Sequence, residues 1–259
     1  MKDNLKRHRD ALIDNLDPLE MESFFEKVTG MLSVEQDQVA LEDLSEQFKS
    51  LPGECSYITD YKTKRLLFKK GFNQLLGYSD GEVDFDFVFQ GYHHEDAVIV
   101  SQVIKAVIAS AVNSVTSDPD LHLSMTYRRK RKDGSYIHIL SQSSVFELDD
   151  RGNLLKSFTR LTDISYLNIS TPVSWSVRSN NIDEHFIQSQ ISKIFENPFT
   201  KREIEIIKEI QIGGSNREIA ERLNLSHHTI ATHRKNILRK SNCNSILDLL
   251  LYCKQFRLI

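Results

Sequence analysis

The spacing of hydrophobic positions divides the chain into three regions. In residues 1–47, apolar side chains such as Phe24 and Val28 recur at helical intervals, which predicts two short helices. From Leu51 onwards, runs of β-branched and aromatic residues are bounded by turn residues, which is typical of strands. In residues 200–259, the hydrophobic positions return to helical spacing. The pattern predicts a helical segment, a strand-rich domain and a second helical domain, in that order.

The strand-rich region contains five stretches with strand character: CSYIT, RLLF, LHLSMTY, SYIHILSQSSVFEL and LLKSFTRLTDI. Turn signals at Asp133-Gly134 and Asp149–Asn153 separate the last three stretches, as expected for consecutive antiparallel hairpins. Helical patterns over residues 71–76 and 97–112 lie between the second and third stretch. The order predicts an α+β domain built on an antiparallel sheet.

A further helix is expected between this domain and the C-terminal region. Ile187, Ile191 and Ile194 share one helical face. We therefore expect four parts: an N-terminal helical segment at 1–47, the α+β domain at 48–178, a linker helix at 179–197 and the helical domain at 198–259.

Helix-start chemistry recurs through the C-terminal region. Thr200–Glu203 and Ser215–Glu218 are capping boxes, Ser226 can cap a third helix, and Ser245 with Asp248 can open a fourth. Only a tight turn at Asn224-Leu225 separates the second helix from the third. Two helices joined in this way form a helix-turn-helix.

The third of these helices has two different faces. On a helical wheel, Ile230, Ile237 and Ser241 point in one direction. The opposite side carries hydrogen-bonding and cationic side chains, namely His228, Thr232, Lys235 and Arg239. Such a stripe suits the major groove of duplex DNA, where base edges are read and phosphates neutralised. A small helical bundle with a solvated basic face is the alternative.

Roles within this stripe follow from position. Thr232 and Lys235 are the candidates for base contacts. Side chains at helix starts, or at the end of the stripe, can fix phosphates; these are Ser215, Asn216, Ser226, Thr229, Arg239 and Lys240. The DNA-contacting set also includes His227, His228 and Ala231. We interpret His233, which flanks the packed side, as structural or phosphate-adjacent.

The segment FTKREIEIIKEIQIGGSNREIAERLNLSHHTIATHRKNILRKS resembles the helix-turn-helix of LuxR/FixJ-type bacterial transcription regulators. The resemblance covers nearly all of residues 198–259. It implies a four-helix DNA-binding domain whose helix at Ser226–Lys240 enters the major groove and whose last helix dimerises. Ser241 stands where the family usually has leucine, and Asn242 where it usually has glycine. In the last helix we expect dimer contacts from Leu247, Leu250, Leu251 and Lys254.

Residues 51–164 resemble a PAS domain. The resemblance lies in FNQLLGYSDGE, Gly91–Asp96, YRRKRKDGSYIHI and LTDIS. It implies a five-stranded antiparallel sheet that cups helices and either holds a ligand or serves dimerisation. The cysteine motif of flavin photosensors is absent from the sequence, and no residue singles out a cofactor.

Two clusters in this domain have competing interpretations. His93-His94-Glu95-Asp96 contains metal-ligand residue types, but acids at a helix start favour interaction with the helix dipole. We therefore expect no metal site. Arg128–Lys132 could form a nucleic-acid patch, but it leads into the Asp133-Gly134 turn, which favours a solvated hairpin.

Charge and composition narrow the function further. Residues 196–259 contain 11 Lys and Arg against 7 Asp and Glu, whereas the preceding residues contain 22 against 29. The basic end is where a polyanionic partner should bind. Three cysteines without C-x-x-C spacing are read as plain thiols. The sequence shows no signal-peptide pattern, no membrane-spanning run and no familiar catalytic motif.

These observations predict a cytoplasmic, one-component transcription regulator that binds double-stranded DNA as a homodimer. The β/α alternation of a phosphoacceptor receiver domain is absent, and Trp175 alone does not make a lactone-sensing pocket. We expect the PAS-like domain to sense a small ligand or a partner. The alternative is a dimerisation scaffold without ligand, and a third hypothesis is an enzyme with a metal bound at His93 and His94.

Overall fold

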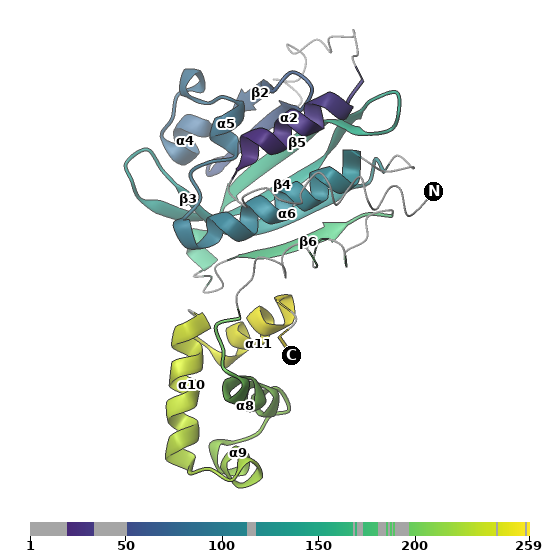
Figure 1. The fold of residues 1–259 in the computed structure, drawn as a ribbon. Coiled ribbons are helices and arrows are strands. Elements are labelled where there is room, and N and C mark those ends of the chain that lie inside the picture. Colours follow the sequence, from purple (N-terminus) through teal and green to yellow (C-terminus); the bar gives the residue numbers. More distant parts are fainter. Residues whose placement is uncertain are drawn as a thin grey trace. The chain divides into compact units, whose positions relative to one another are not determined.

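The computed structural model describes residues 20–33, 51–112, 118–167, 169, 173–180, 185, 187, 189, 197–241, 243–256, 258 and 259 (Figure 1). The chain divides into two compact units. The sheet unit comprises the described residues up to Leu167 and from Val173 to Ser189. The helical unit comprises Ile169 and the described residues from Asn197 onwards.

One antiparallel sheet forms the sheet unit, with the strand order β2-β1-β5-β4-β3-β6. The strands are β1 (Glu54–Asp60), β2 (Arg65–Lys70), β3 (His122–Lys130), β4 (Tyr136–Leu148), β5 (Leu154–Asp163) and β6 (Ser174–Arg178). Both predicted hairpin turns are confirmed. Asp133 Oδ1 accepts a hydrogen bond from the Ser135 amide, and Asp149 Oδ1 accepts one from the Asn153 amide.

The sheet has one strand more than the five that the sequence predicted. The additional strand, β6, pairs with β3 from His122↔Arg178 to Thr126↔Ser174. Its Ser-Trp-Ser-Val-Arg sequence does alternate, but over five residues only, and Val177 is the only buried member. So short an edge strand is recognised by its pairing with β3 rather than by its own pattern.

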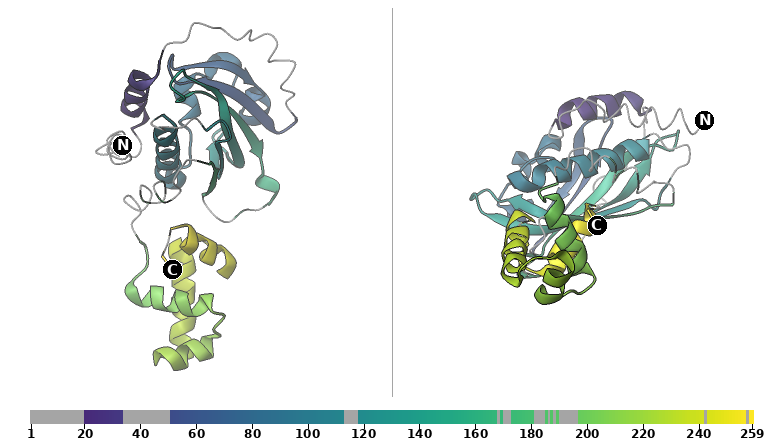
Figure 2. Two further views of the ribbon diagram at one scale, coloured as in Figure 1. Left: turned by 90° about the vertical axis from the view of Figure 1, so that its right-hand side faces the viewer. Right: turned by 60° about the horizontal axis from the view of Figure 1, so that its bottom comes forward.

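Helices cover one face of this sheet. They are α2 (Met21–Met31), α4 (Phe72–Leu76), α5 (Phe85–Val88) and α6 (His94–Val112), with 3₁₀ turns η1 (Asp80–Glu82) and η2 (Ser165–Leu167). The predicted helices at 71–76 and 97–112 are thus confirmed as α4 and α6. In both views of Figure 2, α2 and α6 lie on the same side of the sheet.

Helix α2 is part of the sheet unit and does not stand apart from it. Phe25 stacks on Tyr61 with ring centroids 5.9 Å apart, and Phe85 meets Phe25 edge-on at 4.8 Å. The Lys62 ammonium donates to the Thr29 and Leu32 carbonyls at the end of the helix. A cation at this end also offsets the helix dipole. These contacts fasten α2 to the chain that follows β1.

Some expectations fall outside the described residues. The second N-terminal helix, around Leu41, lies there, as does most of the linker helix at 179–197. Of that linker, His185, Ile187 and Ser189 are helical, and Ile187 is fully buried. The domain boundaries proposed from the sequence stay predictions.

Four helices form the helical unit, as predicted: α8 (Lys201–Gln211), α9 (Asn216–Leu223), α10 (His227–Ser241) and α11 (Ile246–Gln255). The capping boxes at Thr200–Glu203 and Ser215–Glu218 are both formed. Asn224 ends α9 in the left-handed conformation, with φ at 54°. Asparagine tolerates this conformation better than most residues, which permits the sharp turn into α10.

All three cysteines are free and buried, as the absence of paired spacing suggested. Burial raises the pKa of the Cys55 and Cys253 thiols to about 12, so both stay protonated at neutral pH. Among the described residues, none of the helices is long and apolar enough to cross a bilayer.

Candidate functional site

Helix α10 presents the two faces that the wheel predicted. Ile230 and Ile237 are fully buried and Ser241 is 3% exposed. The Ser241 hydroxyl donates to the Ile237 carbonyl at 3.0 Å, so serine is satisfied where the family usually has leucine. Seven of the candidate DNA-contacting residues are exposed on this helix: His227, His228, Ala231, Thr232, Lys235, Arg239 and Lys240.

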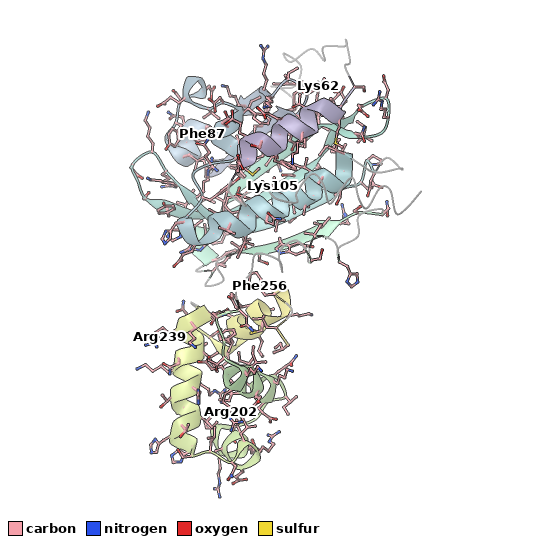
Figure 3. All side chains as sticks on the ribbon, viewed as in Figure 1. Lys62, Phe87, Lys105, Arg202, Arg239 and Phe256 are labelled. Atoms are coloured by element: carbon pink, nitrogen blue, oxygen red, sulfur yellow. The ribbon has the colours of Figure 1, made fainter. Side chains whose placement is uncertain are left out.

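The outer stripe combines hydrogen-bonding groups with free cations. Thr232 Oγ1 donates to the His228 carbonyl at 3.0 Å, which leaves its oxygen as an acceptor. Within the described part of the chain, Lys235 and Arg239 have neither a carboxylate partner nor a side-chain hydrogen bond. Arg239 points away from the other helices of its unit (Figure 3). A duplex phosphate or base edge could therefore reach these side chains without breaking a contact.

Two helix starts lie close in sequence to this stripe. The Ser226 hydroxyl accepts from the Thr229 amide at 3.0 Å and lies 2.8 Å from the Thr229 hydroxyl. The Ser215 hydroxyl accepts from the Glu218 amide at 3.3 Å. First-turn amides and hydroxyls of this kind are the groups that hold phosphate oxygens in protein–DNA complexes.

Asn216 and Lys240 have partners that the sequence analysis did not foresee. The Arg234 guanidinium donates to Asn216 Oδ1 at 2.7 Å and ties α10 to the first turn of α9. The Lys240 ammonium is 2.7 Å from Glu203 Oε2, on a side chain only 5% exposed. Both candidates are thus engaged inside the unit, and their DNA contacts stay predictions.

The spacing of Arg234 from the buried residues of α10 could have predicted that it binds within the unit. It lies four residues after Ile230 and three before Ile237, which places it beside the packed face. His233 is half-buried, in agreement with its interpretation as a flanking residue.

Helix α11 also has two apolar faces. Leu249 and Cys253 are fully buried and Tyr252 is 9% exposed. Leu247 is 66% exposed and Leu251 is 52% exposed, although leucine is normally covered in a small domain. Leu250 is half-buried and Lys254 is exposed. Three of the four expected dimer residues, Leu247, Leu250 and Leu251, therefore leave apolar surface that a second copy could cover, with Lys254 beside it.

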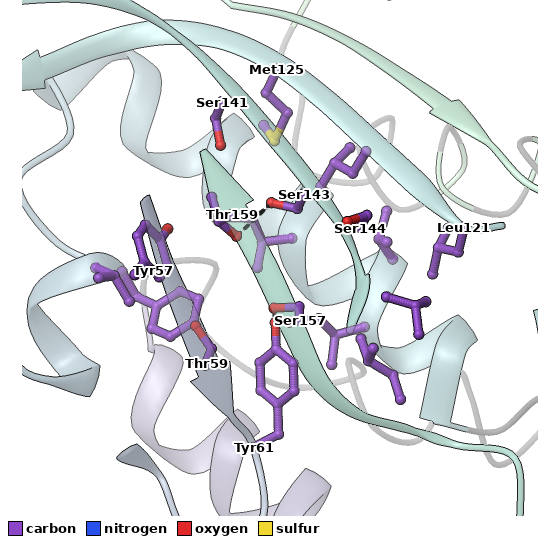
Figure 4. A pocket seen from close by; sticks show the side chains of 18 of the residues that line it. Tyr57, Thr59, Tyr61, Leu121, Met125, Ser141, Ser143, Ser144, Ser157 and Thr159 are labelled. Atoms are coloured by element: carbon purple, nitrogen blue, oxygen red, sulfur yellow. Dashed lines mark hydrogen bonds between the residues drawn. The ribbon is translucent and has the colours of Figure 1, made fainter. Parts of the chain in front are cut away.

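The sheet unit has a partly open cavity of about 60 Å³ between the sheet and its helices (Figure 4). Its apolar wall comes from α6, β3 and the residue just before β3, and includes Ile104, Val107, Ile108, Leu121, Leu123 and Met125. Its polar wall comes from β1, β4 and β5, and includes Thr59, Ser141, Ser143, Ser157 and Thr159. A cavity between sheet and helices with convergent polar groups is a candidate ligand site.

Two pairs of hydroxyl groups form hydrogen bonds with each other along the polar wall. Ser143 and Thr159 hydroxyls lie 2.9 Å apart, as do the Tyr61 and Ser157 hydroxyls (Figure 4). Burial raises the pKa of Tyr61 to about 12, and burial likewise raises the pKa values of Tyr57, Tyr92 and Tyr127. All four phenols are therefore uncharged and able to donate at neutral pH.

The expected solvated hairpin at Arg128–Lys132 is wrong for its first two residues. Arg129 is 2% exposed, and its guanidinium donates to the carbonyls of Phe87, Val88 and Gln90. Its charge also lies over the Phe87 and Tyr92 rings. The carbonyls belong to the last residues of α5 and to Gln90 just after it, about 40 residues before Arg129, so the residues next to Arg129 in the sequence do not reveal the pairing. Arg129 thereby fixes the segment that supplies Val88 and Phe89 to the cavity wall.

Arg128 has a different partner, at the start of α6. Its guanidinium is 2.5 Å from Asp96 Oδ1 and 2.8 Å from Glu95 Oε2, and Asp96 is fully buried. The acids at this helix start thus bind β3 as well as the helix dipole. Across the described residues, no group of three His, Cys, Asp or Glu side chains is arranged to hold a metal ion.

Known families match both units. Residues 197–253 match the family model of the bacterial regulatory proteins of the luxR family. Residues 65–157 match the PAS fold model. The pair of domains inferred from the sequence is therefore confirmed.

Individual relatives match mainly through part of their length. The fimbriae Z protein of Salmonella typhimurium is 40% identical over 62 residues, covering 24% of this chain and 30% of that protein. The nitrate/nitrite response regulator protein NarP of Escherichia coli is 30% identical over 132 residues, covering 46% of this chain and 61% of that protein. This chain thus spans less than two thirds of the curated relatives' length.

Among solved structures, the VqmA dimer of Vibrio cholerae, a LuxR-type receptor, is 16% identical. The match covers 85% of this chain and 89% of the VqmA chain, with a TM-score of 0.35. The likeness to known families therefore rests on the two models: residues 197–253 match the luxR family of bacterial regulatory proteins, and residues 65–157 match the PAS fold.

Proposed function

We propose that this chain is a one-component transcription regulator that binds double-stranded DNA through α10 and has no catalytic activity of its own. The observation that carries the proposal is the outer face of α10. There Thr232, Lys235 and Arg239 lie exposed opposite the buried Ile230 and Ile237. A helix with this division, in a luxR-family match, supports insertion into the major groove.

Within this proposal, base edges and phosphates are contacted by different side chains. Thr232 and Lys235 lie near the middle of the stripe and contact bases. Ser215, Ser226, Thr229 and Arg239 contact phosphates and fix the register of the helix. Arg239 carries the charge that a phosphate attracts, and the hydroxyls lie beside exposed first-turn amides.

The regulator acts as a homodimer in this proposal. The exposed Leu247 and Leu251 support α11 as the contact, with Leu250 and Lys254 beside them. Two identical helices related by a two-fold axis would read two half-sites, which is the usual geometry of helix-turn-helix dimers. A cytoplasmic location follows, because the bacterial chromosome lies in that compartment.

The PAS-fold unit acts as the sensor, and its cavity holds a small ligand. The cavity with its two chemically different walls favours this over a dimerisation scaffold without ligand. A ligand that binds only the folded chain would raise the melting temperature. At a concentration of 100 times its Kd, it would add about 2.7 kcal/mol to the free energy of unfolding. A scaffold would show no such shift.

The DNA proposal is tested with the full chain. Repeated selection from a pool of random duplexes should enrich one sequence with two-fold symmetry, and fluorescence anisotropy should then give a lower Kd for that sequence than for a scrambled duplex. Sedimentation should give a dimer, and Leu247→Asp with Leu251→Asp should shift it towards monomer. Absence of binding to any duplex at modest ionic strength would reject the proposal.

A further inference from the structure

The start of α6 is attached to the edge of β3. The His93 amide donates to the Arg128 carbonyl at 3.0 Å, and the Arg128 amide donates to Asp96 Oδ2 at 2.8 Å. The Arg128 guanidinium adds ion pairs with Asp96 and Glu95. Because β6 pairs with β3 only as far as Thr126, these bonds take the place of a neighbouring strand beside Arg128. Together they form the α6–β3 contact, which joins His93 and Asp96 to Arg128.

Two histidines flank the α6–β3 contact. His138 of β4 is the cross-strand partner of Arg128, so the two side chains leave the sheet on the same face. His93 is the residue immediately before α6, and its side chain is 17% exposed. The His93 ring meets the Tyr136 ring of β4 edge-on, with centroids 4.8 Å apart. Both imidazoles therefore lie close to the Arg128 guanidinium.

The charged groups around His93 come from α6 and β3. Glu95 Oε2 lies 3.7 Å from His93 Nδ1, but the same oxygen accepts from Arg128 Nη2 at 2.8 Å. Asp96 is likewise bound by Arg128, through Oδ1 at 2.5 Å. The His94 ring lies against the His93 ring, with centroids 4.3 Å apart, and would repel it if both were charged. A proton on His93 would thus gain little from acids that Arg128 already binds.

The charged groups that face His138 come from three other elements. They are Arg128 of β3, Asp96 of α6 and Asp163 of β5. Asp163 Oδ2 lies 3.2 Å from the Arg131 guanidinium, so this acid is also paired. A proton on the His138 imidazole would therefore add a positive charge beside Arg128, next to acids that already have cationic partners.

Both histidines are consequently harder to protonate than an ordinary histidine. Burial, followed by the charge of Arg128, lowers the pKa of His93 and of His138 below the ordinary value of 6.5, and the nearby acids oppose this only in part. Asp96 and Glu95 raise the pKa of Arg128, so the guanidinium stays charged. Since the folded pKa values lie below the unfolded one, this contribution to stability is complete above the ordinary histidine pKa and is lost as pH falls through the folded values.

We propose that the α6–β3 contact is a proton-sensitive switch, which is closed while His93 and His138 are neutral and opens when they take up protons. Movement of the start of α6 away from β3 relieves the repulsion, because it separates His93 from the Arg128 guanidinium. Helix α6 carries Ile104 and Val107 of the cavity wall, so opening at its first turn would loosen the attachment of that wall. The switch would make the sheet unit respond to acid without any ligand.

The test follows the hydrogen exchange of single amides by NMR, in the full chain at pH 7.5 and pH 5.5, with rates corrected for the intrinsic effect of pH. The reporters are the amides of His93 and Arg128, because each donates a hydrogen bond across the α6–β3 contact. We expect their protection to be about tenfold lower at pH 5.5. The amides of β5, which lies between β1 and β4, should change less than about twofold.

Replacement of the histidines identifies the groups responsible. His93→Gln combined with His138→Gln keeps polar side chains and removes the titration, so protection of the Arg128 amide at the two pH values should agree within about twofold. His122→Gln is the matched control and should keep the full response. His122 also lies on β3 and burial also lowers its pKa, but its nearby cation is Arg178.

The imidazole signals of the unmodified chain give a second measurement that needs no variant, and both histidines should titrate below pH 6.5. The proposal is overturned by titration above that value, by equal protection of the reporters at both pH values, by a response that persists in the double variant, or by an equal loss in β5. DNA binding at pH 7.5 is measured on the same samples. Failure of the switch with DNA binding intact rejects the switch alone, whereas loss of DNA binding in the unmodified chain rejects the regulator.

Discussion

The basic side chains of β3 and those of the outer stripe of α10 have opposite surroundings. In the sheet unit, Arg128 and Arg129 are turned inward and bound by acceptors from α6 and from α5. Lys156 is similarly held, 2.5 Å from Glu147 Oε2 with 8% of its side chain exposed. In the helical unit, Lys235 and Arg239 lie exposed on α10. A run of cations in the sequence therefore does not by itself indicate a polyanion site.

The difference arises from where the acceptors lie. A side chain on an inner strand has neighbouring elements above it, and their carbonyls and carboxylates can enclose a guanidinium. A side chain on the outer stripe of α10 has no other element of its own unit over it, among the residues described. The first arrangement stabilises the fold, and the second leaves charge available to a partner.

The largest expected effect is on the fold of the sheet unit. Arg129→Met removes the hydrogen bonds that a buried guanidinium donates to three carbonyls, of which Phe87 keeps the Gln90 amide and Val88 keeps the Tyr92 hydroxyl, so we expect about 3 kcal/mol lower stability. Denaturant unfolding followed by fluorescence of Trp175, the single tryptophan, reports this unit. Lys130→Met, at an exposed neighbour, should stay within about 0.5 kcal/mol. Equal losses in both variants would contradict the inward role of Arg129.

The second effect is on DNA binding. Lys235→Ala should cost about 1–3 kcal/mol with the selected duplex and relax preference at one base pair, with the unfolding midpoint unchanged. Lys208→Ala, an exposed cation on α8, is the control and should leave sequence preference intact. Lys240→Ala should lower stability as well as affinity, because Lys240 pairs with Glu203. If Lys235→Ala weakened all duplexes equally, its base contact would be refuted.

A smaller effect concerns the link between α9 and α10. Arg234→Met and Asn216→Ala each remove the same 2.7 Å hydrogen bond, and each should cost about 1 kcal/mol of stability. The double variant should cost less than the sum, with a coupling of about 0.5–1 kcal/mol. Chemical unfolding followed by far-UV circular dichroism measures the cycle. Strict additivity would show that the two side chains act independently in solution.

The smallest effect is a dependence on pH. Burial alone would raise the pKa of Glu203, but Lys240 and the Thr200 amide outweigh it and lower that pKa. Hydrogen bonds from Ser215 lower the pKa of Glu218. Since both folded pKa values lie below the unfolded ones, this stability is present above the ordinary glutamate pKa and is lost as pH falls through the folded values. Circular dichroism melts between pH 6 and pH 3 should show the loss, which Glu203→Gln and Glu218→Gln should flatten.

Features encoded in neighbouring residues could be predicted from the sequence. The four C-terminal helices follow from caps such as Thr200 and Ser215, and the hairpins follow from turns such as Asp133-Gly134. The two faces of α10 follow from helical periodicity alone. These patterns depend on residues three or four positions apart, so they can be recognised without knowing the tertiary structure.

Features that depend on distant partners were missed. The partners of Arg128 and Arg129 lie about 30 to 40 residues earlier in the chain, and β6 is defined by its pairing with β3. The cavity likewise needs β1, β3, β4, β5 and α6 together. Its hydroxyls looked like ordinary alternation in strands until the sheet order placed them on one wall.

Because each unit contains buried cysteines, the rate of cysteine labelling can measure the opening of each unit separately. Cys55 lies in β1, whereas Cys243 and Cys253 lie beside and within α11. A thiol-reactive dye needs access and a thiolate, and burial withholds both until the surrounding unit opens. The labelling rate of Cys55 therefore measures how often the sheet unit opens. The labelling rates of Cys243 and Cys253 measure how often the helical unit opens, and no cysteine has to be introduced.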